Sequence, residues 1–169
     1  MENVNGERLV LGTCYYPEHW DESLWRDDLR RMLENGIEVI RIAEFAWSKI
    51  ERYEGVFNYD FFDRFLDAAA EMGMKVIFCT PTATPPAWLT EKYPEVLNAT
   101  MDGVLYRHGG RRHYNYNSPK YQELTRIIVE KSASHYAKHP AIIGWQIDNE
   151  INCEKNEFYS ESDTIAFRK

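Results

Sequence analysis

Asn149 and Glu150 are the residues of this chain best suited to chemistry, because they stand together directly after an apolar segment, residues 141–147. A carboxyl group such as that of Glu150 can protonate a leaving group and later take a proton from water, if its pKa lies between the two tasks. The neighbouring amide of Asn149 can hold a substrate hydroxyl group. A strand that ends in this pair delivers both side chains to one edge of a sheet, where α/β barrels keep their catalytic groups.

The elements that must position this pair are an alternation of strands and helices. Asp21 is a candidate N-cap, and Gly36 and Gly73 are candidate helix stops. Short, continuous apolar strands separated by helices are typical of a parallel sheet that is covered on both faces and built from right-handed βαβ units. The predicted strands are residues 9–15, 37–42, 74–80 and 141–147, and the predicted helices are residues 21–35, 59–72, 118–136 and one near the C-terminus.

Four such units fit either an α/β barrel or a doubly wound sheet. No GxGxxG or GxxxxGK[ST] loop follows a predicted strand, which disfavours the nucleotide-binding, doubly wound fold. The loops after the strands are dense in polar and aromatic residues, whereas the connections at Asn35-Gly36 and Met72-Gly73 are short. Barrel enzymes build their sites from the loops after the strands, so residues 93–117 are predicted to be an elaborated loop that shapes a pocket.

Composition sets the outer limits. A length of 169 residues indicates one globular domain with a core, and a net charge of −7 argues against nucleic acid or an anionic membrane as partner. No long apolar run or signal-like N-terminus is found, so a cytoplasmic location is predicted. The three cysteines are far apart and odd in number, which indicates free thiols; Cys14 and Cys79 are expected to be buried.

Five ordered motifs carry a resemblance to a known family. They are LGTCYYPEHW, IRIAEFAWSKIE with EGVFNYDFFD, TPTATPPAWL with YPEVL, GGRRHYNYNSP and HPAIIGWQIDNE. Together they resemble the N-terminal part of the family-42 glycoside hydrolases, a bacterial β-galactosidase family, from about Leu9 to Glu150. The resemblance implies an α/β fold of the (β/α)8 TIM-barrel type with only about the first four βα units present. Residues 1–169 would then form the N-terminal half of the catalytic domain.

The resemblance also implies an activity and a set of roles. The family consists of retaining β-galactosidases, which hydrolyse terminal non-reducing β-D-galactosyl residues. Its acid/base falls on Glu150, and the Asn that contacts the sugar next to the scissile bond falls on Asn149. An Arg of the Gly-Gly-Arg-Arg-His-Tyr motif binds the galactosyl unit, and here that role falls on Arg111, with Arg112 as second choice. These types suit the tasks, since an amide can hold the sugar 2-hydroxyl and a guanidinium offers fixed donors.

Two departures from the family pattern bear on activity. Some members bind a structural zinc through a cysteine at the position of Asn115 and through a cysteine cluster after the acid/base, where this chain has only Cys153. No metal and no cofactor are therefore expected. The family's nucleophilic Glu lies at the end of the seventh strand, beyond this chain. Because retaining enzymes need two carboxyl groups about 5–5.5 Å apart, the isolated chain is predicted to be inactive.

Structural alternatives stand beside each functional role. Glu150 could be a solvated or salt-bridged carboxylate, and Arg111 could belong to a loop salt bridge. Glu44 and Trp47 could line a pocket or pack around the barrel mouth. The histidines His19 and His113 are expected to orient loops rather than act as bases.

Two function classes stay open: a β-galactosidase represented by its N-terminal half, and a non-catalytic or vestigial galactoside-binding fragment. A related glycosidase acting on xylan or glucan is disfavoured by the Gly-Gly-Arg-Arg-His-Tyr motif. The expected partner is a β-galactoside, and full-length relatives are expected to form homo-oligomers. A half-barrel exposes two sheet edges, which could pair across a two-fold axis.

Overall fold

The computed structural model describes residues 8–110, 112–151 and 157–169. Two compact units divide the chain. Unit 1 takes in the described residues up to Ala43 together with Tyr59–Cys79 and Tyr136–Ile147. Unit 2 takes in Glu44–Asn58, Thr80–His135 and the described residues from Asp148 onward.

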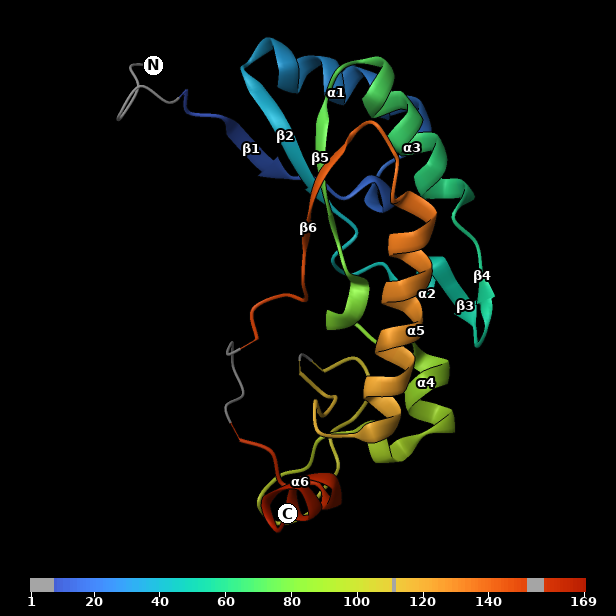
Figure 1. Cartoon of the computed structure of the whole chain (residues 1–169), viewed down its shortest axis with the longest axis vertical. Coiled ribbons are helices and arrows are strands. Elements are labelled where there is room, and N and C mark those ends of the chain that lie inside the picture. The colour runs from blue at the N-terminus through green and yellow to red at the C-terminus, as the bar shows by residue number, and fades with distance from the viewer. Residues whose placement is uncertain (1–7, 111, 152–156) are drawn as a thin grey trace. The chain divides into compact units, whose positions relative to one another are not determined.

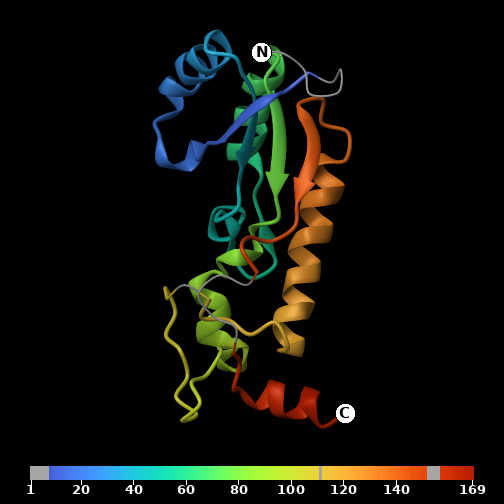
Figure 2. The same ribbon diagram turned by 90° about the vertical axis from the view of Figure 1, so that its left-hand side faces the viewer.

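Unit 1 is built on a parallel four-stranded sheet in the order β1-β2-β5-β6 (Figure 1). Neighbouring strands follow the order of the chain with no reversal, whereas a doubly wound sheet reverses at a switch point. The sheet order therefore decides between the two predicted folds in favour of the barrel type. Figure 2 shows the arrows of β5 and β6 pointing the same way. The strands are β1 (Leu11–Cys14), β2 (Ile37–Ile42), β5 (Lys75–Cys79) and β6 (Ile142–Gln146).

The helices of unit 1 begin and end where the sequence predicts. The Asp21 side chain accepts a hydrogen bond from the Ser23 N–H (2.9 Å) and caps the 3-10 turn Glu22–Leu24, which leads into α1 (Trp25–Glu34). Helix α3 (Asp60–Glu71) packs against α1 and β5. Gly36 and Gly73 both follow a helix with φ of +80°, a conformation that glycine adopts without strain.

Aromatic side chains fill the core between these helices and the sheet. The Trp25 ring meets Phe61 and Phe65 edge-on, with centroids 5.0 and 5.2 Å apart. On the sheet, Phe78 of β5 contacts the rings of Tyr136 (4.9 Å) and Trp145 (5.3 Å). Burying each such side chain contributes about 1.5–3 kcal/mol, so this cluster anchors unit 1.

The edge strands differ from the prediction. Residues 9–15 were expected to form a strand buried on both faces, but β1 spans only Leu11–Cys14 and all four residues are exposed. Among the described strands β1 pairs only with β2, and β6 only with β5, which leaves Ile143 largely exposed as well. The expectation that Cys14 is buried was therefore wrong, whereas Cys79 on the inner strand β5 is buried as predicted.

Unit 2 contains short elements that the sequence analysis did not predict. Helix α2 (Trp47–Ile50) runs directly into a hairpin of β3 (Glu51–Tyr53) and β4 (Val56–Phe57). The buried Glu51 carboxylate accepts hydrogen bonds from Trp47 Nε1 (2.7 Å) and from the Gly55 N–H (2.8 Å), and its burial raises its pKa. The other helices that lie mostly in unit 2 are α4 (Ala87–Lys92), α5 (Pro119–Tyr136) and α6 (Glu161–Phe167). Unit 2 also contains 3-10 turns at Pro81–Ala83 and Pro94–Val96. Unit 1 contains a further 3-10 turn at Pro17–His19.

Residues 93–117 form the predicted elaborated loop, and main-chain hydrogen bonds fold it back on itself. The Asn98 N–H donates to the His113 carbonyl and the Asn115 N–H donates to the Val96 carbonyl, both at 2.8 Å. His113 and Asn115 are thereby fixed to the start of the same loop. Within the described ranges, no helix combines the length and apolar character that a membrane span requires.

Candidate active site

The turn that carries the Asn-Glu pair has an unusual backbone. Asp148 and Glu150 both have positive φ, +55° and +46°, on either side of Asn149. The Asp148 N–H donates to Thr80 Oγ1 (2.7 Å), and the Asp148 carboxylate accepts from the Asn149 N–H (2.5 Å). Non-glycine residues in this region carry strain that surrounding structure must hold, and such residues cluster at functional sites.

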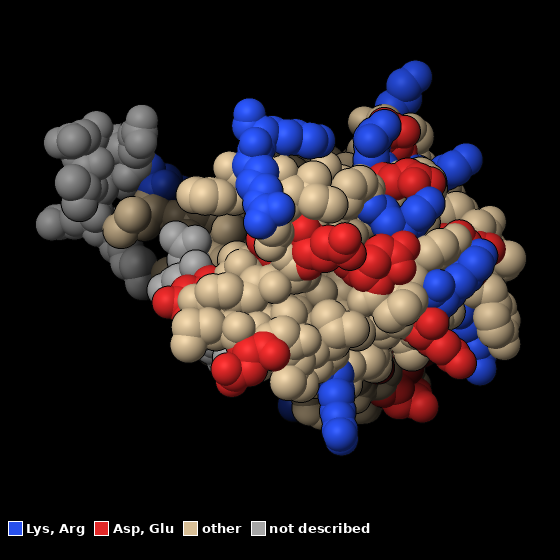
Figure 3. Space-filling view, turned by 90° about the horizontal axis from the view of Figure 1, so that it is seen from below, with Lys and Arg blue, Asp and Glu red and all other residues tan. Residues whose placement is uncertain are grey.

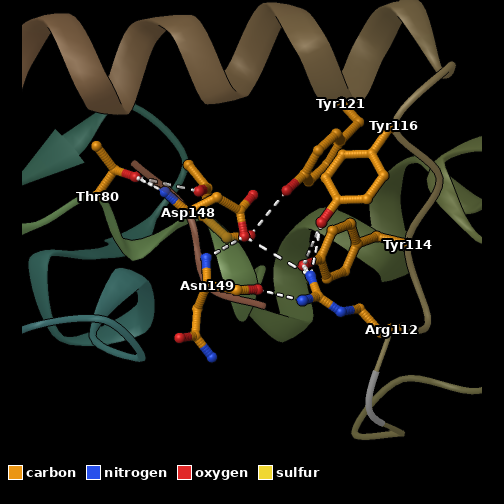
Figure 4. Close-up of polar contacts among 8 residues, drawn as sticks. Thr80, Arg112, Tyr114, Tyr116, Tyr121, Asp148 and Asn149 are labelled. Carbon is orange, nitrogen blue, oxygen red and sulfur yellow. Dashed lines mark hydrogen bonds and ion pairs between the residues drawn. The ribbon is translucent and has the colours of Figure 1, made fainter. Parts of the chain in front are cut away.

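The Arg112 side chain fixes this turn through a hydrogen bond and an ion pair (Figure 4). Its buried guanidinium donates through Nη2 to the Asn149 carbonyl, and its Nη1 lies 3.7 Å from Asp148 Oδ1. The same Nη1 donates to the hydroxyls of Tyr114 (2.8 Å) and Tyr116 (2.6 Å). One side chain of the long loop thus fixes the main chain next to Glu150.

The aromatic residues around Arg112 supply neutral dipoles rather than charge. Burial, above all, raises the pKa of the phenols of Tyr114, Tyr116 and Tyr121, so all three are protonated near neutral pH. Tyr121 stacks on Tyr114 (4.8 Å between centroids) and donates its hydroxyl to the Thr82 carbonyl (2.7 Å). The Arg112 charge is therefore balanced by the nearby Asp148 carboxylate and solvated by these hydroxyls.

A cavity of about 500 Å³ lies beside this turn, within the range of pockets that bind small molecules. Asn149 forms part of its lining together with Arg112 and His113 of the long loop. The remaining described lining residues are Phe45, Ser48, Ala83, Thr84, Pro85, Pro86, Ala87, His108, Gly109 and Gly110.

His113 is a buried, neutral member of this lining. Its Nδ1 lies 2.5 Å from the Gly110 carbonyl, which can only accept, so Nδ1 carries the proton. Burial lowers the pKa of His113 and His108 lowers it further, while the hydrogen bond to Gly110 acts in the opposite direction. The hydrogen bond to Gly110 ties the ring to its own loop, and the orienting role expected from the sequence stays a prediction.

The structure places the predicted site residues in different surroundings. Asn149 is buried at the cavity and Glu150, next to it, is exposed. Arg111 lies outside the described residues, so its role stays a prediction. Arg112, the second choice, uses its Nη1 and Nη2 donors on protein groups.

Of the two side chains expected either at the pocket wall or in packing, Trp47 can be assigned. Glu44 and Trp47 are both buried, and Trp47 donates to Glu51 instead of lining the cavity, so packing is its role. His19 stacks on Tyr16 in unit 1, at 5.2 Å between centroids.

Several residues of this site were not singled out from the sequence. Thr80 and Thr84 belong to the segment Thr80-Pro81-Thr82-Ala83-Thr84, where hydroxyls directly after an apolar strand were an available signal. The function of Thr80 as acceptor for the Asp148 N–H depends on a partner 68 positions away, which spacing along the chain does not reveal.

The zinc site of some relatives does not fit the residues present. The Asn115 amide donates to Ser160 Oγ and to Asp163 Oδ2, both at 2.5 Å, and its Oδ1 accepts from the Asn117 N–H (2.7 Å). An amide engaged in this way replaces a thiolate ligand with a hydrogen-bond network. Cys153 lies outside the described residues.

Known β-galactosidases are similar to this chain. A family model described as Beta-galactosidase, of glycoside hydrolase family 42, matches residues 14–169. Beta-galactosidase BgaA of Thermus sp. is 46% identical over 144 residues, 85% of this chain and 22% of the relative. Beta-galactosidase Bga of Halorubrum lacusprofundi is 41% identical over 161 residues, 95% of this chain and 23% of the relative.

Solved structures of β-galactosidases are similar to this chain as well. The β-galactosidase of the psychrophilic Marinomonas ef1 superimposes with a TM-score of 0.91 at 43% identity, covering 95% of this chain and 24% of that one. The polyextremophilic β-galactosidase of Halorubrum lacusprofundi gives a TM-score of 0.87 at 38% identity. This chain therefore spans about a quarter of the length of these relatives and has the fold of the N-terminal part of their TIM barrels. With a match over nearly its whole length and five motifs in order, the chain belongs to the family-42 glycoside hydrolases, the β-galactosidases.

Proposed function

We propose that this chain carries half of the catalytic machinery of a retaining β-galactosidase that hydrolyses terminal non-reducing β-D-galactosyl residues. Glu150 is its general acid/base, Asn149 binds the galactosyl 2-hydroxyl, and Arg111 binds the same sugar unit. The observation that supports this proposal most is the turn at residues 148–150. Its strained backbone is held by Arg112 and Thr80, and its Asn149 lies at the cavity.

The chemistry follows from the two roles of one carboxyl group. In the first step Glu150 gives its proton to the glycosidic oxygen as the bond to the anomeric carbon breaks, and a second carboxylate bonds to that carbon. In the second step Glu150 takes a proton from water, whose oxygen displaces the second carboxylate. Asn149 can strengthen its hydrogen bond to the 2-hydroxyl as positive charge develops on the sugar ring.

The second carboxylate has to come from elsewhere in the barrel. We propose that residues 1–169 form the N-terminal half of the catalytic domain and that the 169-residue chain alone binds a galactoside without hydrolysing it. A non-catalytic, galactoside-binding role is the second candidate. It is supported by the cavity lining, whose described residues include Asn149 but no Asp or Glu.

A neutral sugar suits the charges of this chain better than a polyanion. The net charge is −7, and on the face seen in Figure 3 basic and acidic side chains are interspersed rather than gathered into a basic field. We accordingly propose a β-galactoside as partner, a cytoplasmic location, and no nucleic acid or membrane as partner. Homo-oligomers are proposed for the longer relatives.

Galactose binding to the 169-residue chain tests the proposal. A single sugar should bind in the millimolar range, about −4 kcal/mol, measured by ligand-observed NMR. Asn149→Ala removes the amide but keeps the main-chain hydrogen bonds of the turn, and it should weaken binding at least about tenfold. The matched control is Asn35→Ala at the end of α1 in unit 1, which should leave the affinity unchanged. Equal affinity for wild type and Asn149→Ala would remove Asn149 from the site.

A further inference from the structure

Glu51 of β3 is a buried carboxylate that the proposed reaction does not use. The residue is only 3% exposed. Its Oε2 accepts a hydrogen bond from Trp47 Nε1 (2.7 Å), and its Oε1 accepts one from the Gly55 N–H (2.8 Å). Taking a carboxylate out of water is costly, and an apolar side chain at this position would avoid that cost. The presence of Glu51 therefore calls for a reason beyond stability.

The bond to Glu51 fixes the ring of Trp47, which is fully buried. The main chain of Glu51 is held as well, because the Trp88 indole N–H donates to the Glu51 carbonyl (3.0 Å). The Trp47 ring contacts the ring of Tyr121, with centroids 6.5 Å apart and planes tilted by 48°. Since a protein interior is close-packed, a change in the orientation of Trp47 must displace Tyr121.

The first route from Tyr121 to the turn of Glu150 runs through a second aromatic ring (Figure 4). Tyr121 stacks on Tyr114, with centroids 4.8 Å apart and an angle of 22° between the planes. The Tyr114 hydroxyl accepts a hydrogen bond from Arg112 (2.8 Å), which donates in turn to the Asn149 carbonyl. Tyr114 is fully buried and Tyr121 is 2% exposed, so neither ring can move alone.

The second route runs through hydroxyl groups. The Tyr121 hydroxyl donates to the Thr82 carbonyl (2.7 Å). The hydroxyls of Thr82 and Thr80 are 3.3 Å apart, and Thr80 Oγ1 accepts from the Asp148 N–H (2.7 Å). The two routes end on the main chain of the turn, at the Asp148 N–H and at the Asn149 carbonyl. A displacement of Tyr121 therefore acts on the turn from two sides.

We infer that Glu51 is a positioning residue for the turn that carries Glu150. It fixes the ring of Trp47, and through Trp47 and Tyr121 it holds the main chain of the turn. Every residue of this network belongs to unit 2. The inference rests on the proposed function, which gives Glu150 and Asn149 their roles. It goes beyond that function, because it assigns a role to a carboxylate that is not among the described residues of the cavity lining.

Hydrogen exchange of the 169-residue chain tests this role without a ligand. Glu51→Ala should speed exchange of the Asp148 amide by about two- to thirtyfold, the range of effects transmitted through packed contacts. Glu51→Gln, which keeps one acceptor oxygen, should recover part of the protection. The matched control is Glu54→Gln in the same hairpin, where the carboxylate accepts from Lys92 and from the Tyr93 hydroxyl. This control should leave the Asp148 rate unchanged.

A purely structural role of Glu51 would give a different pattern of exchange. The Asn58 N–H donates to the Ile50 carbonyl (2.8 Å) at the base of the hairpin. Faster exchange at Asn58 with a wild-type rate at Asp148 would confine the effect of Glu51 to the hairpin and overturn the inference.

A double-mutant cycle tests whether Glu51 acts through Trp47. Trp47→Phe removes the indole N–H and should speed exchange of the Asp148 amide as Glu51→Gln does. The combined variant should add little to either change, because both remove the same contact. Additive effects would mean that Glu51 does not act through Trp47. These two variants keep the test decisive should Glu51→Ala not fold.

Galactose affinity separates this inference from the proposed function. Glu51→Ala should weaken galactose binding together with the protection of the Asp148 amide. If Asn149→Ala weakens galactose while Glu51→Ala does not, the positioning role is wrong and the galactosyl site stands. If no sugar binds to a folded wild-type chain, the galactosyl site fails, and exchange at Asp148 still decides whether Glu51 holds the turn.

Discussion

The guanidinium of Arg112 donates a hydrogen bond to the main-chain carbonyl of Asn149, 37 positions later in the chain. This contact joins the long loop to the turn that carries Glu150, and both ends have positive φ, at Arg112 (+56°) and at Asp148 and Glu150. Two strained segments therefore hold one another in place. The position of the proposed acid/base depends on a side chain that takes no part in the chemistry.

Replacing Arg112 should destabilise unit 2 and disturb the turn. Arg112→Met leaves the buried Asp148 carboxylate and the Asn149 carbonyl without this partner, and breaking a buried charged pair costs about 3–5 kcal/mol. Urea denaturation should show this loss, whereas Arg107→Met, on the exposed part of the same loop, should cost less than about 0.5 kcal/mol. Similar small losses of stability for both variants would mean that the Arg112 contacts do not hold the turn.

Thr80 offers a finer test, because Thr and Val have nearly the same shape. Thr80→Val removes the acceptor of the buried Asp148 N–H and should lower the free energy of unfolding by about 1–3 kcal/mol. Thr80→Ser keeps the hydroxyl and should retain most of the stability. The hydrogen-exchange rate of the Asp148 amide should rise in the Val variant only. An unchanged exchange rate would contradict the assigned bond.

The sequence and the structure agree where the pattern is local and differ where it depends on distant partners. The helix signals at Asp21, Gly36 and Gly73 were sufficient, because caps and stops act within one turn. The exposure of β1 was not predictable from its apolar residues, since burial depends on which strand lies on its other edge. Arg112 was ranked below Arg111 for the same reason: its partners at Asn149 and Asp148 come together only in the folded chain. The elements α2 and β3–β4 are too short to produce a period.

His113 should make stability depend on pH. Burial, and to a smaller extent the neighbouring His108, lowers the pKa of His113 below its ordinary 6.5, against the opposing hydrogen bond to Gly110. The rings of His108 and Tyr114 pack edge-on against His113. The unfolded chain therefore binds a proton first as the pH falls. The stability contributed by neutral His113 is complete above about pH 6.5 and is lost as the pH falls through the lower, folded-state pKa.

Denaturation at pH 7.5 and at pH 5.5 measures this dependence. The wild type should lose more stability between the two than His113→Gln, which cannot be protonated. His135→Phe serves as control and should keep the wild-type dependence. A His113→Gln chain with an unchanged pH response would show that another group causes it.

Asp163 should hold helix α6 to the long loop. Its carboxylate accepts from Ser160 N (2.8 Å), from the Asn115 amide (2.5 Å) and from the Asn117 amide (2.7 Å). Asp163→Ala removes the capping box as well, at a cost of about 0.5–2 kcal/mol. Amide exchange in α6 should accelerate up to roughly thirtyfold. Glu161→Gln, exposed in the same first turn, is the control. Equal protection in both variants would leave the network without a stabilising role.

Transfer of this chain into a complete barrel tests the role of Glu150 most directly. Residues 14–169 replace the matching segment of the Thermus sp. β-galactosidase, and Glu150→Gln is compared with the unmutated chimera and with Glu157→Gln. Loss of an acid/base should slow cleavage of lactose by about 10²–10⁴-fold. A galactoside with a dinitrophenyl leaving group, which needs no proton to depart, should still form the galactosyl-enzyme, and azide, which attacks it without a base, should restore turnover. Equal losses on both substrates, with no response to azide, would contradict Glu150 as acid/base.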